Sequence, residues 1–302
     1  MVPDATPRSY YGLPVISQPV WKSRDIAGYF FLGGLAGASS TLALGAQLTG
    51  RPGLARSSRL AAAGAIGLSA AALVHDLGRP ERFYNMLRVF KPTSPMSVGS
   101  WLLAAYGPMA VTAAGTAATG LRPGLGTAAS AGAALLGPAV ASYTGVLVSD
   151  TAVPAWHEGH RHMPYLFASS AASAAGGLGL VAAPRRDNGP ARRMGVAGAA
   201  GELALFRIMR QSMGRAGRAY TEGRAHRWTR RAETLTLAGL VGAAVGARRS
   251  RVAAALSGSA LLAGSACTRW AVFEAGLQSA RDPDDTVIPQ RERLRRRPGP
   301  DG

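Results

Sequence analysis

The sequence contains a single cysteine, Cys267, among 302 residues, and only two lysines, Lys22 and Lys91. One cysteine cannot form an internal disulfide bond, and it cannot hold an iron–sulfur cluster by itself. A phosphate-binding glycine loop, a metal-ligand cluster and a Ser-His-Asp arrangement are also missing from the sequence. These absences argue against a disulfide-stabilised secreted domain, and we expect no metal centre in this chain.

Charged residues are absent from four long stretches of the chain. These stretches lie between Asp25 and Arg51, Lys91 and Arg122, Arg122 and Asp150, and Arg161 and Arg185. Each is long enough for a helix to cross a hydrocarbon core of roughly 30 Å, which takes about 20 residues. Weaker apolar runs lie at 60–75, 194–206, 234–247 and 252–268, where arginines near the ends can extend a span. We therefore predict an all-α, polytopic integral membrane protein with eight transmembrane helices in two four-helix halves.

Large aliphatic residues are sparse in these runs, and the mean hydropathy of the chain is only +0.08. Alanine, glycine and serine take their place, as at Gly33, Gly34 and Gly37 in the first run. Lipid provides no hydrophobic attraction between helices, so small residues that let backbones approach closely stabilise a bundle through packing. A GC-rich coding sequence would also favour alanine, glycine and arginine, and the two explanations are compatible.

The N-terminal region lacks the apolar core of a signal peptide, because the first 25 residues are polar and contain proline. With eight spans both termini fall on one face, named side A, together with the loops near 76–96, 150–163 and 210–230. Side A carries 23 of the 34 Lys and Arg residues. Such residues gather in cytoplasmic loops, so we predict a multi-pass protein of the cell (inner or plasma) membrane whose termini are cytoplasmic.

The same argument divides the chain into three parts. We expect an interfacial segment at 1–25, a transmembrane domain at 26–278 and a basic polar tail at 279–302. The formal net charge of +18 then reports membrane topology, and we expect no nucleic-acid partner.

All histidines and all tryptophans of the chain fall on side A. The tryptophans are Trp21, Trp101, Trp156, Trp228 and Trp270. An ordinary aromatic belt places tryptophan at both membrane surfaces. Because Trp and Arg are favoured at protein interfaces, this one-sided distribution predicts a protein partner docked on side A.

His75 and Asp76 end the second predicted span, and Arg79 follows them. A carboxylate beside an imidazole at the mouth of a membrane bundle could exchange protons with a substrate whose reduction consumes them, such as a quinone. The alternative is that Asp76 only pairs with Arg79 and holds the turn. We take His75, Asp76 and Arg79 as candidate catalytic residues.

Residues 80–91 predict a short interfacial helix with Phe83, Leu87 and Phe90 on one face. It could form one wall of the entrance for a lipid-soluble ligand, or it could simply anchor the chain at the headgroups.

On the fourth predicted span, Tyr143 and Asp150 are two helical turns apart and share a face. A phenol and a carboxylate placed in this way could bind and protonate a quinone, although a buried tyrosine more often donates to a backbone carbonyl.

Glu202 is the one acid that lies well inside a predicted span. Counting from Arg193 at about 1.5 Å per residue places it roughly 14 Å deep, near the midplane of the membrane. An intramembrane carboxylate is functional by default, and we expect Glu202 on a proton path toward side A. A hidden ion pair with Arg207 is the alternative.

Because no histidine lies deep in any predicted span, we expect no haem.

Four motifs together resemble the polysulfide reductase membrane subunit family, NrfD-like. They are residues 26–37 (IAGYFFLGGLAG), 76–83 (DLGRPERF), 94–99 (SPMSVG) and 143–145 (YTG). The resemblance covers the first four predicted spans, and the last four match only in number and spacing.

This resemblance implies an eight-helix membrane subunit without haem that exchanges electrons with menaquinone or ubiquinone. It also implies a docked ferredoxin-like iron–sulfur subunit, which commonly serves a molybdopterin catalytic subunit. His75, Asp76, Tyr143 and Trp21 fall where the family places its quinone site. Many members carry a polar residue directly before the tryptophan, whereas Val20 precedes Trp21 here.

Three functions therefore stay open. The first is a quinone-binding subunit of a respiratory redox complex of the formate dehydrogenase or polysulfide reductase type. Its electron transfer could also be coupled to proton movement across the membrane. The second is a proton-coupled secondary transporter with Glu202 as its coupling carboxylate. The third is a structural membrane anchor without quinone chemistry.

Overall fold

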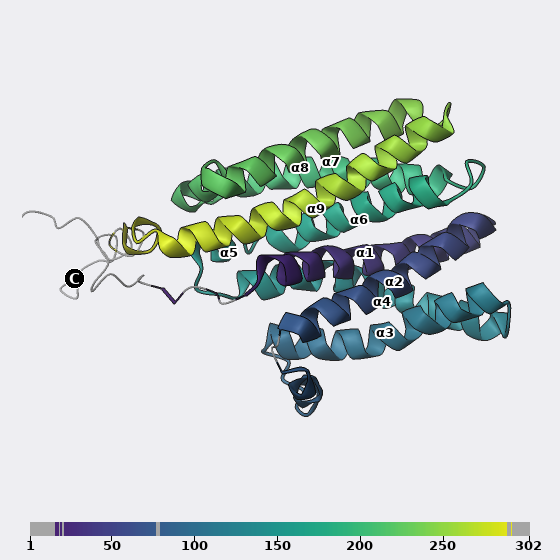
Figure 1. The fold of residues 1–302 in the computed structure, drawn as a ribbon, viewed down its shortest axis with the longest axis horizontal. Coiled ribbons are helices and arrows are strands. Elements are labelled where there is room, and N and C mark those ends of the chain that lie inside the picture. The colour runs from purple at the N-terminus through teal and green to yellow at the C-terminus, as the bar shows by residue number, and fades with distance from the viewer. Residues whose placement is uncertain (1–15, 18, 20, 77–78, 289–290, 292–302) are drawn as a thin grey trace, which may run out of the picture.

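The computed structural model describes residues 16–17, 19, 21–76, 79–288 and 291. Val20 and most of the basic tail lie outside the described residues. Within them, every regular element is a helix (Figure 1). The long helices are α1 (Ser23–Leu48), α2 (Pro52–Asp76), α3 (Pro95–Thr119), α4 (Pro123–Ser149), α6 (Met163–Ala182), α7 (Gly189–Ser212), α8 (Gly223–Val241) and α9 (Arg251–Arg281). The short ones are η2 (Pro80–Leu87), α5 (Pro154–His157), η3 (Gly214–Tyr220) and η4 (Gly242–Gly246).

Proline and serine mark where several of these helices begin. Pro52, Pro95 and Pro123 each take the first turn of a helix, where the missing N–H group has no intrahelical partner in any case. Ser94 and Ser250 accept hydrogen bonds from backbone N–H groups of the first turns of α3 and α9.

The helices that begin or end near arginine are longer than the apolar runs that predicted them. The run at 234–247 belongs to a helix that already begins at Gly223, and the run at 252–268 is part of a helix of 31 residues that ends at Arg281. Arginine favours helix nearly as strongly as leucine does, so a charged end extends a helix that hydropathy alone would cut short.

Four helices are long and apolar enough to cross a membrane by length and composition. They are Asp25–Leu48, Pro52–Asp76, Pro123–Ser149 and Met163–Ala182. The all-α prediction is confirmed for the described residues, whereas eight membrane crossings stay a prediction.

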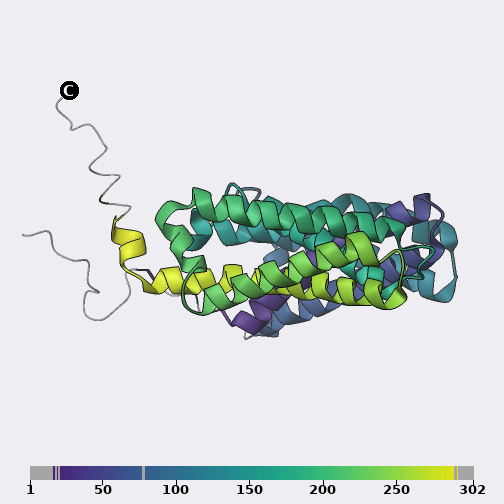
Figure 2. The ribbon, with the colours of Figure 1, turned by 90° about the horizontal axis from the view of Figure 1, so that it is seen from above.

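The long helices lie side by side along one axis, and their connections gather at two ends (Figures 1 and 2). Helices α1–α4 pack on one another, as do α6–α9, and α1 and α6 join the two groups. At the side A end, the backbone N–H of Lys22 contacts Asp76, and that of Ala155 donates to Ser279. At the opposite end, named side B, Gln47 donates to Thr127.

Small residues set the distance between α1 and α4. A Cβ atom on Gly137 would lie 2.4 Å from the carbonyl oxygen of Gly37, and a Cβ atom on Gly37 would lie 2.4 Å from the oxygen of Gly137. The two backbones are therefore in direct contact at this crossing. This agrees with the expectation that small residues take the place of large aliphatic ones at the helix contacts.

We predict that Gly137→Ala destabilises the full-length chain by about 1–3 kcal/mol, because the added methyl group pushes α1 and α4 apart. Gly45→Ala on α1 is the control, since nothing lies within 4 Å of a Cβ atom at Gly45. The measurement is the free energy of unfolding in mixed detergent micelles. Equal stability of the two variants would contradict the close crossing.

Candidate functional site

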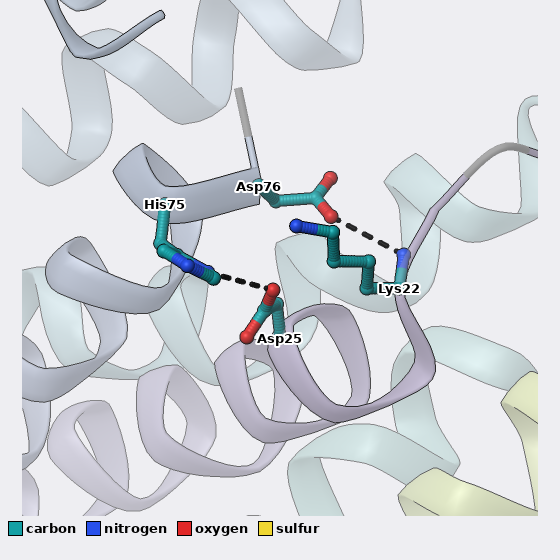
Figure 3. Close-up of polar contacts among 4 residues, drawn as sticks. All are labelled: Lys22, Asp25, His75 and Asp76. Carbon is teal, nitrogen blue, oxygen red and sulfur yellow. Dashed lines mark hydrogen bonds and ion pairs between the residues drawn. The ribbon is translucent and has the colours of Figure 1, made fainter. Parts of the chain in front are cut away.

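Two contacts tie the start of α1 to the end of α2 at side A (Figure 3). The backbone N–H of Lys22 donates to Asp76 Oδ1 at 3.2 Å, and His75 Nδ1 lies 2.9 Å from Asp25 Oδ2. The His75 side chain is 69% exposed, so its pair with Asp25 adds little stability. Among the described residues no ion pair joins Asp76 to Arg79.

Asp76 also lines a cavity of about 120 Å³ enclosed by α1–α4 and η2. Most of its walls are apolar, and its polar side chains are those of Tyr29, Asp76, Ser100 and Tyr143, beside the indole of Trp21. The other lining residues are Ile26, Phe30, Leu73, Met86, Met96, Gly99, Leu103 and Leu147. An apolar space with a few convergent polar groups is the usual form of a small-molecule site, and this one is smaller than the roughly 300–1,000 Å³ that is typical.

The structure brings together only some of the residues that the sequence predicts for the site. Trp21, Asp76 and Tyr143 line the cavity. His75 contacts Asp25 beside the cavity and does not line it. Arg79 and Asp150 are exposed and lie outside the lining. Because Asp150 comes directly after α4 and has a non-helical backbone conformation, it does not continue the helix face that carries Tyr143.

Tyr143 is the polar group of the cavity that most clearly lacks a partner. Its side chain is buried, and its hydroxyl makes no hydrogen bond to any described residue. The ring lies against α3 where Gly99 leaves room, since a Cβ atom there would be 2.4 Å from Tyr143 Cε2. A buried hydroxyl without a partner is costly, so this one fits a cavity whose ligand supplies a hydrogen-bond acceptor or donor.

Trp21, which lines the cavity, also belongs to a stack of aromatic rings that extends away from it. Its ring lies 5.7 Å from that of Trp156, which lies 5.8 Å from Phe273. Trp156 is fully buried, and its Nε1–H donates to the carbonyl of Val272 at 2.8 Å. Gly276 makes room for this indole, because a Cβ atom there would lie 1.9 Å from it. The stack fixes Trp21 at the cavity wall.

This packing changes the interpretation of the one-sided tryptophans. Trp21, Trp228 and Trp270 pack against the same buried cluster as Trp156, and only Trp101 is exposed, at 41%. Most of them therefore stabilise the side A end of the bundle from within. They are not evidence for a docked partner, although they leave that prediction open.

The short helix after Asp76 forms part of the cavity wall. It is a 3₁₀ helix that ends at Leu87, rather than an α-helix that reaches residue 91. With three residues per turn, the face that points inward differs from the α-helical expectation, and Met86 lines the cavity in place of Leu87. Farther on, the ring of Phe90 packs edge-on against Trp101 with centroids 6.2 Å apart.

Glu202 lies in a second polar cluster, buried between α6, α7 and α9. Its Oε1 accepts hydrogen bonds from Ser170 at 2.8 Å and from Thr268 at 2.6 Å. Ser170 in turn contacts Ser265 at 2.8 Å. Glu202 Oε2 is buried without a hydrogen-bond partner among the described residues.

Among the described residues Glu202 forms no ion pair within 4.0 Å with either Arg207 or Arg269, and Arg269 is the arginine whose charge acts on it through the buried core. Arg269 is fully buried, its Nη2 donates to the carbonyl of Phe167 at 2.8 Å, and its guanidinium lies 3.9 Å over the Phe167 ring. Sequence reasoning missed this residue because it cut the last span at 268. The signal that could have identified it is an arginine directly after the predicted end of the last span, where the helix continues as far as Arg281.

One aromatic pair separates the two polar sites. Phe30 lines the cavity, and its ring lies 5.9 Å from that of Phe167. The guanidinium of Arg269 lies over the ring of Phe167. The cavity and the Glu202 cluster are therefore neighbours within one core, on either side of the contact between α1 and α6.

Comparison with known proteins identifies the family of this chain. The family model described as "Polysulphide reductase, NrfD" matches residues 13–279, and the chain belongs to that family. A search of curated proteins finds no match. The resemblance carried by the motifs in the first four spans is thereby confirmed and extends through the second half of the chain. As the family and the apolar helices indicate, this is an integral membrane protein.

We predict that Arg269→Met lowers the free energy of unfolding by about 2–4 kcal/mol, because it leaves the Glu202 carboxylate buried without its opposite charge. Glu202→Gln keeps an acceptor for Ser170 and Thr268, so we expect a smaller loss. The double variant should recover about 1–3 kcal/mol relative to the sum of the single changes. Additive effects in this cycle would show that the two charges do not interact.

Proposed function

We propose that this member of the NrfD family is the quinone-binding membrane subunit of a respiratory redox complex. In this proposal it passes electrons between the membrane quinone pool, menaquinone or ubiquinone, and a ferredoxin-like iron–sulfur subunit docked on side A. A molybdopterin enzyme is the catalytic partner that the family favours. Side A faces the cytoplasm, in keeping with the excess of arginine there.

The observation that supports the proposal is the cavity at the end of α2. Its walls are mostly apolar, as a lipid-soluble ligand needs. It also offers an Asp76 carboxylate and a Tyr143 hydroxyl that lacks any other partner among the described residues. Asp76, Tyr143 and Trp21 are the residues that would hold the quinone head group.

A bound quinone supplies two-electron redox chemistry that takes up or releases two protons. Asp76 is placed to exchange such protons, because it lines the cavity and its Oδ2 makes no hydrogen bond to a described residue. The bond from the Lys22 backbone to Oδ1 holds the carboxylate in position. His75 and Asp25 lie beside it on the outer side, where an exposed imidazole can relay protons to water. Tyr143 orients the head group by hydrogen bonding, and the Trp21 stack excludes water from one side.

Replacing Asp76 tests this assignment. We expect Asp76→Asn to lower quinone-dependent turnover of the assembled complex by about 10²-fold, the usual contribution of a general acid or base. The asparagine carbonyl can still accept from Lys22 N–H, so assembly should persist. The measurement is the rate of quinone reduction or quinol oxidation, with co-purification of the partner subunits as the assembly check.

Asp150→Asn is the matched control, since Asp150 is an exposed carboxylate at the same end that does not line the cavity. Unchanged turnover in Asp76→Asn would leave the chain as a structural anchor. Loss of turnover in both variants to the same degree would point to a general effect of negative charge on side A.

We further propose that Glu202 belongs to a proton path that serves this site. An intramembrane carboxylate with one oxygen free of hydrogen bonds is costly to keep without a role, and the Phe30–Phe167 contact places it next to the cavity. Ser170, Ser265 and Thr268 provide hydroxyl groups that can pass a proton along α6 and α9.

We expect Glu202→Gln to reduce proton movement per electron in proteoliposomes by at least about half, while turnover in the presence of an uncoupler changes much less. A pH-sensitive dye measures the protons. Glu274→Gln is the control, because Glu274 lies near side A and pairs with Arg224 at 3.4 Å. An unchanged proton-to-electron ratio in Glu202→Gln would refute the path and leave the quinone assignment standing.

A further inference from the structure

A large cleft opens between α7 and α8 at the side A end, away from the sites described above. Its volume is about 700 Å³, and η3 closes its upper edge. It forms because α7 packs mainly on α6 and α8 mainly on α9. Figure 2 shows α7 and α8 wide apart where η3 joins them.

The upper part of the cleft is positively charged. Arg207, Arg210 and Arg218 line it together with a single acid, Glu233. Arg210 Nη2 already pairs with Glu233 Oε1, whereas no carboxylate of the described residues lies within ion-pair distance of Arg207 or Arg218. Arg210 Nε is buried and has no hydrogen-bond partner among the described residues. The cleft therefore holds an excess of about two positive charges, and an anion would satisfy donors that now lack acceptors.

The lower part of the cleft is apolar. Leu203 and Leu237 line it, and Leu237 is 53% exposed. The Arg210–Glu233 pair sets a common level on the two helices. At about 1.5 Å per residue, Leu237 lies about 6 Å below this level and Leu203 about 10 Å below it. In the predicted eight-span topology, the cleft runs from a cationic mouth at side A down toward the hydrocarbon of the membrane.

We propose that this cleft binds an anionic phospholipid of the side A leaflet, with the phosphate between Arg207, Arg210 and Arg218 and an acyl chain along Leu203 and Leu237. Arginine donors at interfacial depth match a lipid phosphate, and basic pockets between spanning helices at this level suit anionic headgroups. The lipid would join α7 to α8, whose mutual contact is much smaller than that of α7 with α6 or of α8 with α9.

Charge and depth together favour a lipid over other anions. A free phosphate ion would use the arginines and leave the leucine half of the cleft empty. An acidic segment of a docked subunit could reach the arginines from side A, but it would have to enter hydrocarbon depth to cover Leu203 and Leu237. Only an amphiphile with an anionic head satisfies both halves.

The test compares lipid binding to the full-length chain, purified in mild detergent with the subunits that accompany it. Native mass spectrometry measures the affinity for phosphatidylglycerol and for phosphatidylcholine with the same acyl chains. We expect the wild-type chain to prefer phosphatidylglycerol, and the double variant Arg207→Gln with Arg218→Gln to bind it about tenfold more weakly. The matched control removes two exposed arginines of α8 that do not line the cleft, Arg227→Gln with Arg230→Gln, and should bind like the wild type.

A second variant tests the apolar half. Leu237→Trp leaves every arginine in place but fills the lower cleft, so it should weaken binding of long-chain phosphatidylglycerol and leave a short-chain analogue unaffected. Equal lipid affinity in the wild type and the cleft variants would overturn the proposal. Displacement of the lipid by millimolar inorganic phosphate would mark a free-anion site instead. Loss of an accompanying subunit without loss of lipid would mark a protein contact.

Discussion

Helices in lipid are held together by close contact rather than by the hydrophobic effect, and most features of this chain follow from that constraint. Backbone polar groups must be satisfied within each helix, and adjacent helices gain stability only by approaching closely. Gly37 and Gly137 show the result, because their backbones touch where α1 crosses α4. The same requirement explains how a chain with a mean hydropathy near zero can form a bundle of long helices.

Close contact leaves little space, so the places where polar side chains remain inside are distinctive. At the end of α2, η2 and four helices leave a small cavity with one carboxylate and one unpartnered phenol. Between α6, α7 and α9, Glu202 and Arg269 are buried in the same interior as three hydroxyl side chains. Both groups of residues are expensive to bury, and the aromatic contact between Phe30 and Phe167 sets them next to each other. This adjacency is the physical basis on which we propose a link between quinone chemistry and proton movement in one subunit.

Much of the architecture could be predicted from the sequence, since uncharged runs and proline positions indicate long helices directly. The family resemblance also followed from short motifs at the ends of spans, where backbone turns require particular residues. The candidate site was predicted less completely. Asp76, Tyr143 and Trp21 meet at the cavity, but Asp150 follows the last turn of α4 and is exposed. Arg269 was missed because hydropathy ends a span at the first charge, whereas here the carbonyl and the ring of Phe167 hold an arginine inside the helix bundle.

The sequence by itself determined that the chain is helical, belongs in a membrane and concentrates its arginine, histidine and tryptophan on one side. These properties depend on composition and on spacing along one helix, which local physics controls. Only the tertiary structure decided which side chains share a space. It buried Trp156, which the sequence had assigned with the other tryptophans to a docking surface on side A. It also paired His75 with Asp25 and placed Arg269 and Glu202 in the same buried core. Such contacts join residues far apart in the chain, and they depend on how closely small residues allow particular helix faces to approach.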